Sequence, residues 1–445
     1  MVSITLSRVL VFLTALPWAL GHLVSHDTRA LPRDLDPFYK PPAGFESKDP
    51  GTILRTRRVV VSFFGLIPDP VEGFQLLFRT NSVNGSAIAS ATTIFKPAFA
   101  KTDRLVSFQT AYDSSASKCD PSYSYQLGTP QEDLVSSAEL VILQGYLLSG
   151  YMVVSTDYEG PDAAFTAGRM SGMGVLDGIR AAQNFDKLGL KANPMVVGVG
   201  YSGGAIATGW AAGLQPSYAP ELSIKGWVSG GTPANLTGVL VYIDKTSFSG
   251  FLPAAVDGLL KPSAYLARLG DLVDKYIQPA GRRALAFANN NCAPADIVAF
   301  ANQSIFDPPF QSLGRDLLYL PRVEEVLQEN IMGVQKSETP TAPVYLYHSA
   351  ADEIIPYTNV TTLDKAWCSN GATVKFVTYS SGSHAATEAS SFPAALKFVK
   401  QAFAGGVTPG CESTTVSKKS GDFNSVDANV QTVEDELQRL LKQMD

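Results

Sequence analysis

Apolar and polar residues alternate along the first third of this chain of 445 residues. The alternation is clearest over 59–64, 73–80 and 89–95, and turn-forming residues separate these segments. A period of two is typical of half-buried strands, and short turns favour antiparallel neighbours. The pattern therefore predicts a sheet that opens with antiparallel strands.

From residue 105 onward, short apolar segments alternate with segments of helical period. The expected strands are 106–108, 152–154, 195–199, 344–347 and 374–377, and 170–185 is an expected helix. Alternation of strands with helices is typical of a parallel sheet that is covered on both faces. We therefore expect an α/β fold with a mostly parallel central sheet.

One long segment, 235–335, interrupts this alternation. It contains two helical patterns, at 264–276 and 323–331, and a hydrophobic stretch at 248–260. Its place in the order of strands and helices predicts a helical lid or cap over a functional site. A purely structural helical subdomain is the alternative.

The two ends of the chain differ from its centre. Residues 1–21 carry Arg8 before an apolar run that is too short to cross a bilayer, which predicts a secretory signal peptide cut after Gly21. We find no second apolar run of about 18 residues and expect no transmembrane segment. The main domain is expected over 22–411. Residues 412–445 are expected to form a polar linker and a short amphipathic helix with one apolar face, formed by Val433, Leu437, Leu440, Leu441 and Met444.

Composition narrows the functional classes. The net charge is −6 and the isoelectric point is near 5.4, which argues against nucleic acid as a partner. The chain has glycosylation sequons at Asn84, Asn235, Asn302 and Asn359. Its four cysteines are Cys119, Cys292, Cys368 and Cys411. They are not spaced as metal ligands, and in an oxidising compartment they predict two disulfides.

A candidate nucleophile follows the expected strand 195–199. Ser202 lies at the centre of the pattern G-x-S-x-G, between that strand and a segment of small residues with helical character. This context is typical of the nucleophile elbow of an α/β-hydrolase, where a sharp turn presents the serine hydroxyl. A tight structural turn is the alternative.

The partners of Ser202 can be sought by elimination. His22 and His26 lie beside the leader, and His348 ends an expected strand, which leaves His384, in a loop after a strand, as the base. In this fold the acid lies between serine and histidine along the chain. Asp352 follows the expected strand 344–347 and is the candidate acid, with Glu353 as its immediate competitor and Asp364 as a distant one.

An ester hydrolase also needs N–H donors for the negative charge that develops on the carbonyl oxygen. The N–H of Gly203, directly after the nucleophile, is one candidate. The second should come from the loop 109–115. Spacing alone does not choose between Tyr112, Asp113 and Ser114.

Further motifs resemble the fungal secretory lipase family of the Candida lipase A type, from about Asp36 to Cys411. Besides the serine motif they are Asp36-Pro37-Phe38-Tyr39, Asp157-Tyr158-Glu159-Gly160, Gly230-Gly231-Thr232-Pro233 and Asp352-Glu353-Ile354-Ile355-Pro356-Tyr357. The resemblance implies Ser202, Asp352 and His384 as a catalytic triad, and the amides of Asp113 and Gly203 as the oxyanion hole. It also implies disulfides Cys119–Cys292 and Cys368–Cys411, and an acyl-binding tunnel in the 235–335 lid. Residues 412–445 depart from the family, whose members carry a C-terminal hairpin there.

These observations predict a secreted carboxylic-ester hydrolase that works through an acyl-serine intermediate, needs no cofactor or metal and resembles a triacylglycerol lipase. Its substrate would be a lipid or an acetylated small molecule, with a lipid interface as a possible partner. The first alternative is an acetyl esterase acting on a fungal secondary metabolite such as a trichothecene. A serine peptidase and an inactive binding module on the same fold are further alternatives.

Overall fold

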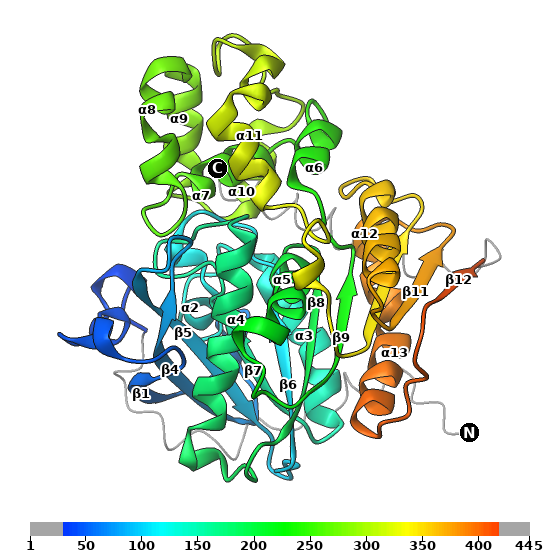
Figure 1. Ribbon diagram of the computed structural model, residues 1–445. Helices are drawn as coiled ribbons and strands as arrows, with labels where there is room; N and C mark the ends of the chain where they lie inside the picture. Colours follow the sequence, from blue (N-terminus) through cyan, green and yellow to red (C-terminus); the bar gives the residue numbers. More distant parts are fainter. Residues whose placement is uncertain (1–29, 418–445) are drawn as a thin grey trace.

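The computed structural model describes residues 30–417, and its centre is a ten-stranded sheet (Figure 1). The strand order is β1-β4-β5-β7-β6-β8-β9-β10-β11-β12. The pairs from β1 to β7 are antiparallel, and all pairs from β7 to β12 are parallel. The strands are β1 (Ile53–Val59), β4 (Glu72–Asn81), β5 (Ala87–Lys96), β6 (Arg104–Gln109), β7 (Met152–Thr156), β8 (Met195–Tyr201), β9 (Ile224–Gly230), β10 (Val344–Ser349), β11 (Val374–Tyr379) and β12 (Glu412–Val416).

Helices cover both faces of the sheet. On one face lie α4 (Gly168–Gln183), α5 (Gly203–Tyr218) and α12 (Tyr357–Ser369), and on the other lie α3 (Leu134–Leu148) and α13 (His384–Phe403). Neighbouring strand residues point to opposite faces, so Leu105 joins the first apolar cluster and Val106 the second. The expected α/β-hydrolase architecture, with its mostly parallel sheet, is therefore confirmed.

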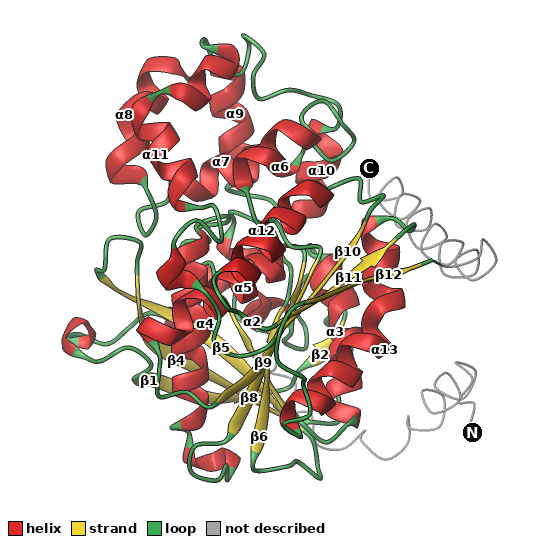
Figure 2. Cartoon of the chain, turned by 45° about the vertical axis from the view of Figure 1, so that its right-hand side comes forward, coloured by secondary structure: helices red, strands yellow, loops and turns green. Residues whose placement is uncertain are grey.

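The segment between β9 and β10 forms a separate layer of helices and loops above the sheet (Figure 2). Its two ends meet, since Asn235 pairs with Ile331 and the N–H of Met332 donates to the carbonyl oxygen of Ala234 over 2.9 Å. One apolar cluster lies mostly within this layer, and a second one joins it to the start of α4 and to β5. Its helices are α6 (Leu236–Ile243), α7 (Phe251–Leu259), α8 (Leu266–Tyr276), α9 (Pro279–Ala288), α10 (Ala293–Phe300) and α11 (Pro321–Glu329).

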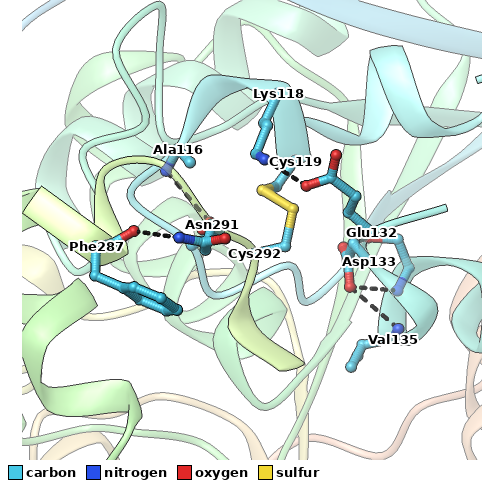
Figure 3. Close-up of a disulfide and its surroundings, with 11 residues drawn as sticks. Ala116, Lys118, Cys119, Glu132, Asp133, Val135, Phe287, Asn291 and Cys292 are labelled. Carbon is cyan, nitrogen blue, oxygen red and sulfur yellow. Dashed lines mark hydrogen bonds and ion pairs between the residues drawn. A yellow bond between two sulfur atoms is a disulfide. The ribbon is translucent and has the colours of Figure 1, made fainter. Parts of the chain in front are cut away.

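Two disulfides connect distant parts of the chain. Cys119 is bonded to Cys292, which attaches the loop after β6 to the α9–α10 junction of the insertion (Figure 3). Cys368, in α12, is bonded to Cys411, directly before β12. Both pairings are those that the family resemblance implies.

Local structure departs from the expectations at both edges of the sheet. The first strand of the sheet is 53–59 and not the expected 59–64. Part of the expected range, Ser62–Phe63 (β2), instead forms a small hairpin with Ile67–Pro68 (β3). Residues 412–416, expected as polar linker, form β12 and pair with β11. Both are edge strands: the side chains of β12 are exposed and those of β1 are half-buried or exposed, so backbone hydrogen bonds hold these strands without a clear hydrophobic pattern in the sequence. The leader and the C-terminal amphipathic stretch lie outside the described residues.

Candidate active site

Ser202 occupies the sharp turn between β8 and α5. Its backbone has φ 52° and ψ −124°, a strained conformation for a residue with a side chain. Its N–H donates to the carbonyl oxygen of Gly230 over 3.0 Å. A Cβ on Gly204 would overlap the carbonyl oxygen of Gln109, so only glycine lets the first turn of α5 pass so close to β6. The turn thus has the backbone of a nucleophile elbow.

Asp352 and His384 form a buried pair although 32 residues separate them. The Asp352 Oδ2 atom lies 2.7 Å from His384 Nδ1. The other oxygen, Oδ1, accepts the N–H groups of Ile354 and Ile355 over 2.9 and 2.8 Å. Both side chains of the pair are buried. All the donors around Asp352 favour its carboxylate form.

Burial and charge act in opposite directions on this pair. Burial opposes ionisation of Asp352, but the charge and the hydrogen bond of His384 outweigh it, so the pKa of Asp352 is lowered. Burial likewise opposes a charge on His384, and the charge and hydrogen bond of Asp352 outweigh it, so the pKa of His384 is raised. The carboxylate therefore stabilises an imidazolium, which is the form that a general base takes after it accepts a proton.

The imidazole of His384 lies beside the residues that flank Ser202. Its ring centroid is 4.8 Å from that of Tyr201, and a Cβ on Gly231 would come within 2.8 Å of the His384 Cε1 atom. Its Nε2 atom is buried and has no hydrogen-bond partner among the described residues. His384 is the first residue of α13 rather than part of the preceding loop. The geometry thus leaves Nε2 as the free nitrogen of the ring.

The competing residues lie in other positions. His348 is buried in β10, with its Nε2 atom 3.0 Å from the carbonyl oxygen of Ile355 and 3.4 Å from Asp352 Oδ2, and burial lowers its pKa. Glu353 contacts the backbone of His384 and not its ring. Asp364 lies in α12. Of the candidate acids, Asp352 is the one bonded to the imidazole.

Asp113 lies against Gly203, across from the first turn of α5. A Cβ on Gly203 would overlap the Asp113 Oδ1 atom. Asp113 has φ 44°, and burial, reinforced by the charge of Asp133, raises the pKa of its carboxyl to about 7. Tyr112 and Ser114 have other partners: the Tyr112 hydroxyl accepts the N–H of Glu159, and the Ser114 hydroxyl donates to the carbonyl oxygen of Asn291. Of the three residues left open by spacing, Asp113 is the one that lies against Gly203, next to Ser202.

A buried acid supports the loop that carries Asp113. The Glu139 carboxylate, in α3, accepts the N–H of Ala111 over 2.8 Å. Sequence reasoning missed Glu139 and Tyr201 as parts of this site, and it considered Glu353 only as a competing acid. For Glu139 a pattern existed, because it is the one charged residue in the otherwise uncharged helix 134–148.

A mostly apolar cavity opens onto these residues. Ser202, Gly203 and Asp113 form part of its wall, and apolar side chains of α6 and α7 form much of the rest. They include Leu236, Leu240, Ile243, Leu252 and Leu259. A cavity of this kind fits a hydrocarbon chain attached to a reactive carbonyl group.

The sequons fall into two environments. Asn84 and Asn302 are exposed. Asn235 and Asn359 are half-buried, and the Asn359 amide donates to the carbonyl oxygen of Asn235. Because glycan attachment needs an accessible amide, the glycosylation prediction is better suited to the first two.

Neither a metal centre nor a membrane span is found between residues 30 and 417. No group of three or more His, Cys, Asp or Glu side chains in this part of the chain is arranged to hold a metal ion. No helix in the same range combines the length and the apolar character needed to cross a bilayer.

Comparison with known proteins gives consistent matches. A sequence model of the secretory lipase family matches residues 125–410. The secreted triacylglycerol lipase LIP1 of Malassezia furfur is 41% identical over 384 residues, which cover 85% of this chain and 78% of the relative. The structure of Candida antarctica lipase A in its closed state is similar with a TM-score of 0.80 and 31% identity, covering 88% of this chain and 91% of that one. The rice cell wall degrading esterase LipA from Xanthomonas oryzae shares the fold, with a TM-score of 0.58 at 15% identity, covering 80% of this chain and 98% of its own.

Proposed function

The chain belongs to the secretory lipase family, and from this membership we propose that it hydrolyses triacylglycerols with Ser202, His384 and Asp352 as its catalytic triad. It is a secreted serine ester hydrolase. The observation that carries the proposal of a lipid substrate is the apolar cavity, since its wall joins Ser202 to hydrophobic residues of α6 and α7. Such a wall suits a long acyl chain better than a small polar acid.

The proposed reaction has two halves. In the first, His384 Nε2 accepts the proton of the Ser202 hydroxyl as Oγ attacks the ester carbonyl carbon. The N–H groups of Gly203 and Asp113 hydrogen-bond the oxyanion, and the intermediate collapses to acyl-serine while the alcohol leaves with the proton from His384. In the second half, His384 deprotonates a water molecule that attacks the acyl-serine. The carboxylic acid is released and Ser202 regains its proton.

The insertion supplies a further element of the proposal, which is contact with a lipid surface. Three apolar or aromatic residues of α6 and α10 are exposed, namely Val241, Tyr242 and Val298. Helix α6 also forms part of the cavity wall. We expect these exposed residues to meet an emulsion droplet, so that acyl chains pass from lipid into the cavity.

A panel of esters from acetate to oleate, with and without a triacylglycerol emulsion, tests the proposal. We expect kcat/KM to rise with acyl length and the emulsion to be hydrolysed. Ser202→Ala should lower kcat by about a million-fold, as in comparable triads. Preference for acetyl esters without emulsion hydrolysis would instead indicate a small-acyl esterase. Retention of activity by Ser202→Ala would overturn the assignment of the nucleophile.

A further inference from the structure

Two adjacent acids contact His384 through different atoms. Asp352 accepts a hydrogen bond from the ring, at Nδ1. Glu353 accepts the backbone N–H of His384 with both carboxylate oxygens, at 2.9 and 3.2 Å. One dipeptide therefore holds both the side chain and the main chain of the base.

The position of His384 explains why its main chain needs a partner. It is the first residue of α13, a helix of 20 residues, and the N–H groups of a first turn have no acceptor within the helix. The hydroxyl of Ser383, which precedes it, accepts the N–H of Ala386. The N–H of His384 is left to Glu353, whose negative charge also suits the positive end of the helix dipole.

A second contact holds the same residue from the opposite end. The Tyr201 hydroxyl donates to the carbonyl oxygen of His384 over 2.7 Å. Tyr201 directly precedes Ser202, so this bond ties the base to the nucleophile turn. With N–H, carbonyl oxygen and Nδ1 all bonded, Nε2 is the one polar atom of His384 that remains unpaired in the described structure.

We propose that Glu353 is a positioning residue for the general base, fixing the His384 main chain so that the ring faces Asp352 and Ser202 together. Its negative charge also favours the imidazolium that forms when His384 accepts a proton. The inference rests on the proposed triad. It separates the roles of the two acids that the sequence left in competition.

Several other titratable groups face His384. They are Asp352 in the loop after β10, His348 in β10, Glu388 one turn further along α13, and Asp113 in the loop after β6. Asp352, Glu353 and Glu388 all raise the pKa of His384 against the effect of burial. Among these groups Glu353 is the one that bonds the backbone N–H, so its removal changes both geometry and charge.

Two substitutions separate geometry from charge. Glu353→Ala removes the acceptor and the charge, whereas Glu353→Gln keeps an acceptor oxygen and removes the charge alone. The readouts are kcat for a soluble ester and the rate of Ser202 labelling by a fluorophosphonate, each measured across pH. Glu72→Gln, an exposed residue of β4 paired with Arg58, is the matched control.

Loss of the charge-assisted hydrogen bond in Glu353→Ala should lower kcat and the labelling rate about tenfold. Glu353→Gln should keep most of the wild-type kcat and labelling rate, because it retains an acceptor oxygen. Because the carboxylate raises the pKa of His384, and the base acts when neutral, the acidic limb of the Gln variant should move to lower pH. Glu72→Gln should match the wild type in both rate and pH profile.

Two results would overturn the inference. One is a Glu353→Ala variant with wild-type rates and an unchanged pH profile. The other is a Glu353→Gln variant that is as slow as Glu353→Ala and has an unmoved acidic limb. Failure of the wild type to be labelled at Ser202 would instead refute the proposed triad, and this inference with it.

Discussion

Asp113 places a carboxyl group where negative charge is expected to develop during the reaction. Its Oδ1 atom is buried without a hydrogen-bond partner in the described structure and lies against Gly203. Burial raises the pKa of the group to about 7. Below that pH the carboxyl is neutral and compatible with a nearby oxyanion, and above it the carboxylate repels the oxyanion. Asp113 is therefore expected to set an upper pH limit for hydrolysis.

Substitution of Asp113 by Asn tests this limit. The variant keeps the backbone N–H but cannot ionise, so its kcat should persist above pH 7, where the wild-type rate falls. The measurement is kcat from pH 5 to about 9, a range that brackets the raised pKa of Asp113. Asp364→Asn, in α12, serves as a control and should keep the wild-type profile. An alkaline limb shared by Asp113→Asn and the wild type would contradict the role of this carboxyl.

At the scale of elements, the disulfide between Cys119 and Cys292 joins the helical insertion to the loop that carries Asp113. The residues around it reinforce this junction, since Ser114 donates to the carbonyl oxygen of Asn291, the neighbour of Cys292. The bond closes a chain separation of 173 residues. The longer the segment that a disulfide closes, the more it restricts the unfolded chain.

Replacing both Cys119 and Cys292 by serine should therefore affect stability and catalysis together. We expect the free energy of unfolding to fall by about 2–5 kcal/mol, a typical range for a native disulfide. We expect kcat to fall as well, because the loop with Asp113 loses its anchor. Calorimetry and steady-state kinetics measure the two effects.

The second disulfide provides the matched comparison. Replacing Cys368 and Cys411 by serine removes a bond between α12 and the start of β12, which do not line the cavity. This pair of substitutions should lower stability with little change in kcat. Equal effects of the two double substitutions on kcat would show that the link to the oxyanion loop has no catalytic consequence.

At the scale of the whole molecule, the insertion touches the loop of the candidate catalytic acid. The Tyr242 hydroxyl, in α6, donates to the carbonyl oxygen of Asp352 over 2.9 Å. The same helix contributes Leu236, Leu240 and Ile243 to the cavity wall. An acyl chain bound in the cavity would therefore contact α6, the helix that is also bonded to the loop of Asp352.

Tyr242→Phe should reveal this connection through its dependence on the substrate. Loss of one hydrogen bond should lower kcat/KM for long-chain esters about threefold to tenfold, with a smaller effect on acetyl esters, because a short acyl group would make less contact with α6. Tyr319→Phe, an exposed tyrosine elsewhere in the insertion, is the control and should behave as wild type. An equal loss on acetyl and long-chain esters would argue against coupling through α6.

Most of the fold could be predicted from the order of residues along the chain. Apolar periodicity located β6, β7, β8, β10 and β11 and the helix α4, because burial against the sheet constrains the residues of those elements. Local spacing also singled out Ser202, since the turn needs glycine at fixed positions. The candidate base and acid followed from chain order and elimination rather than from contacts.

Contacts between residues far apart in the sequence became visible in the folded chain alone. In the folded chain Asp113 lies against Gly203, whereas spacing had left Tyr112, Asp113 and Ser114 open. Asp352 bonds the ring of His384 and Glu353 bonds its backbone N–H, whereas the sequence left both as candidate acids. Residues 412–416 also pair with β11. Backbone hydrogen bonds at a sheet edge and contacts across the fold depend on where elements meet in space, and neither leaves a periodic pattern along the chain.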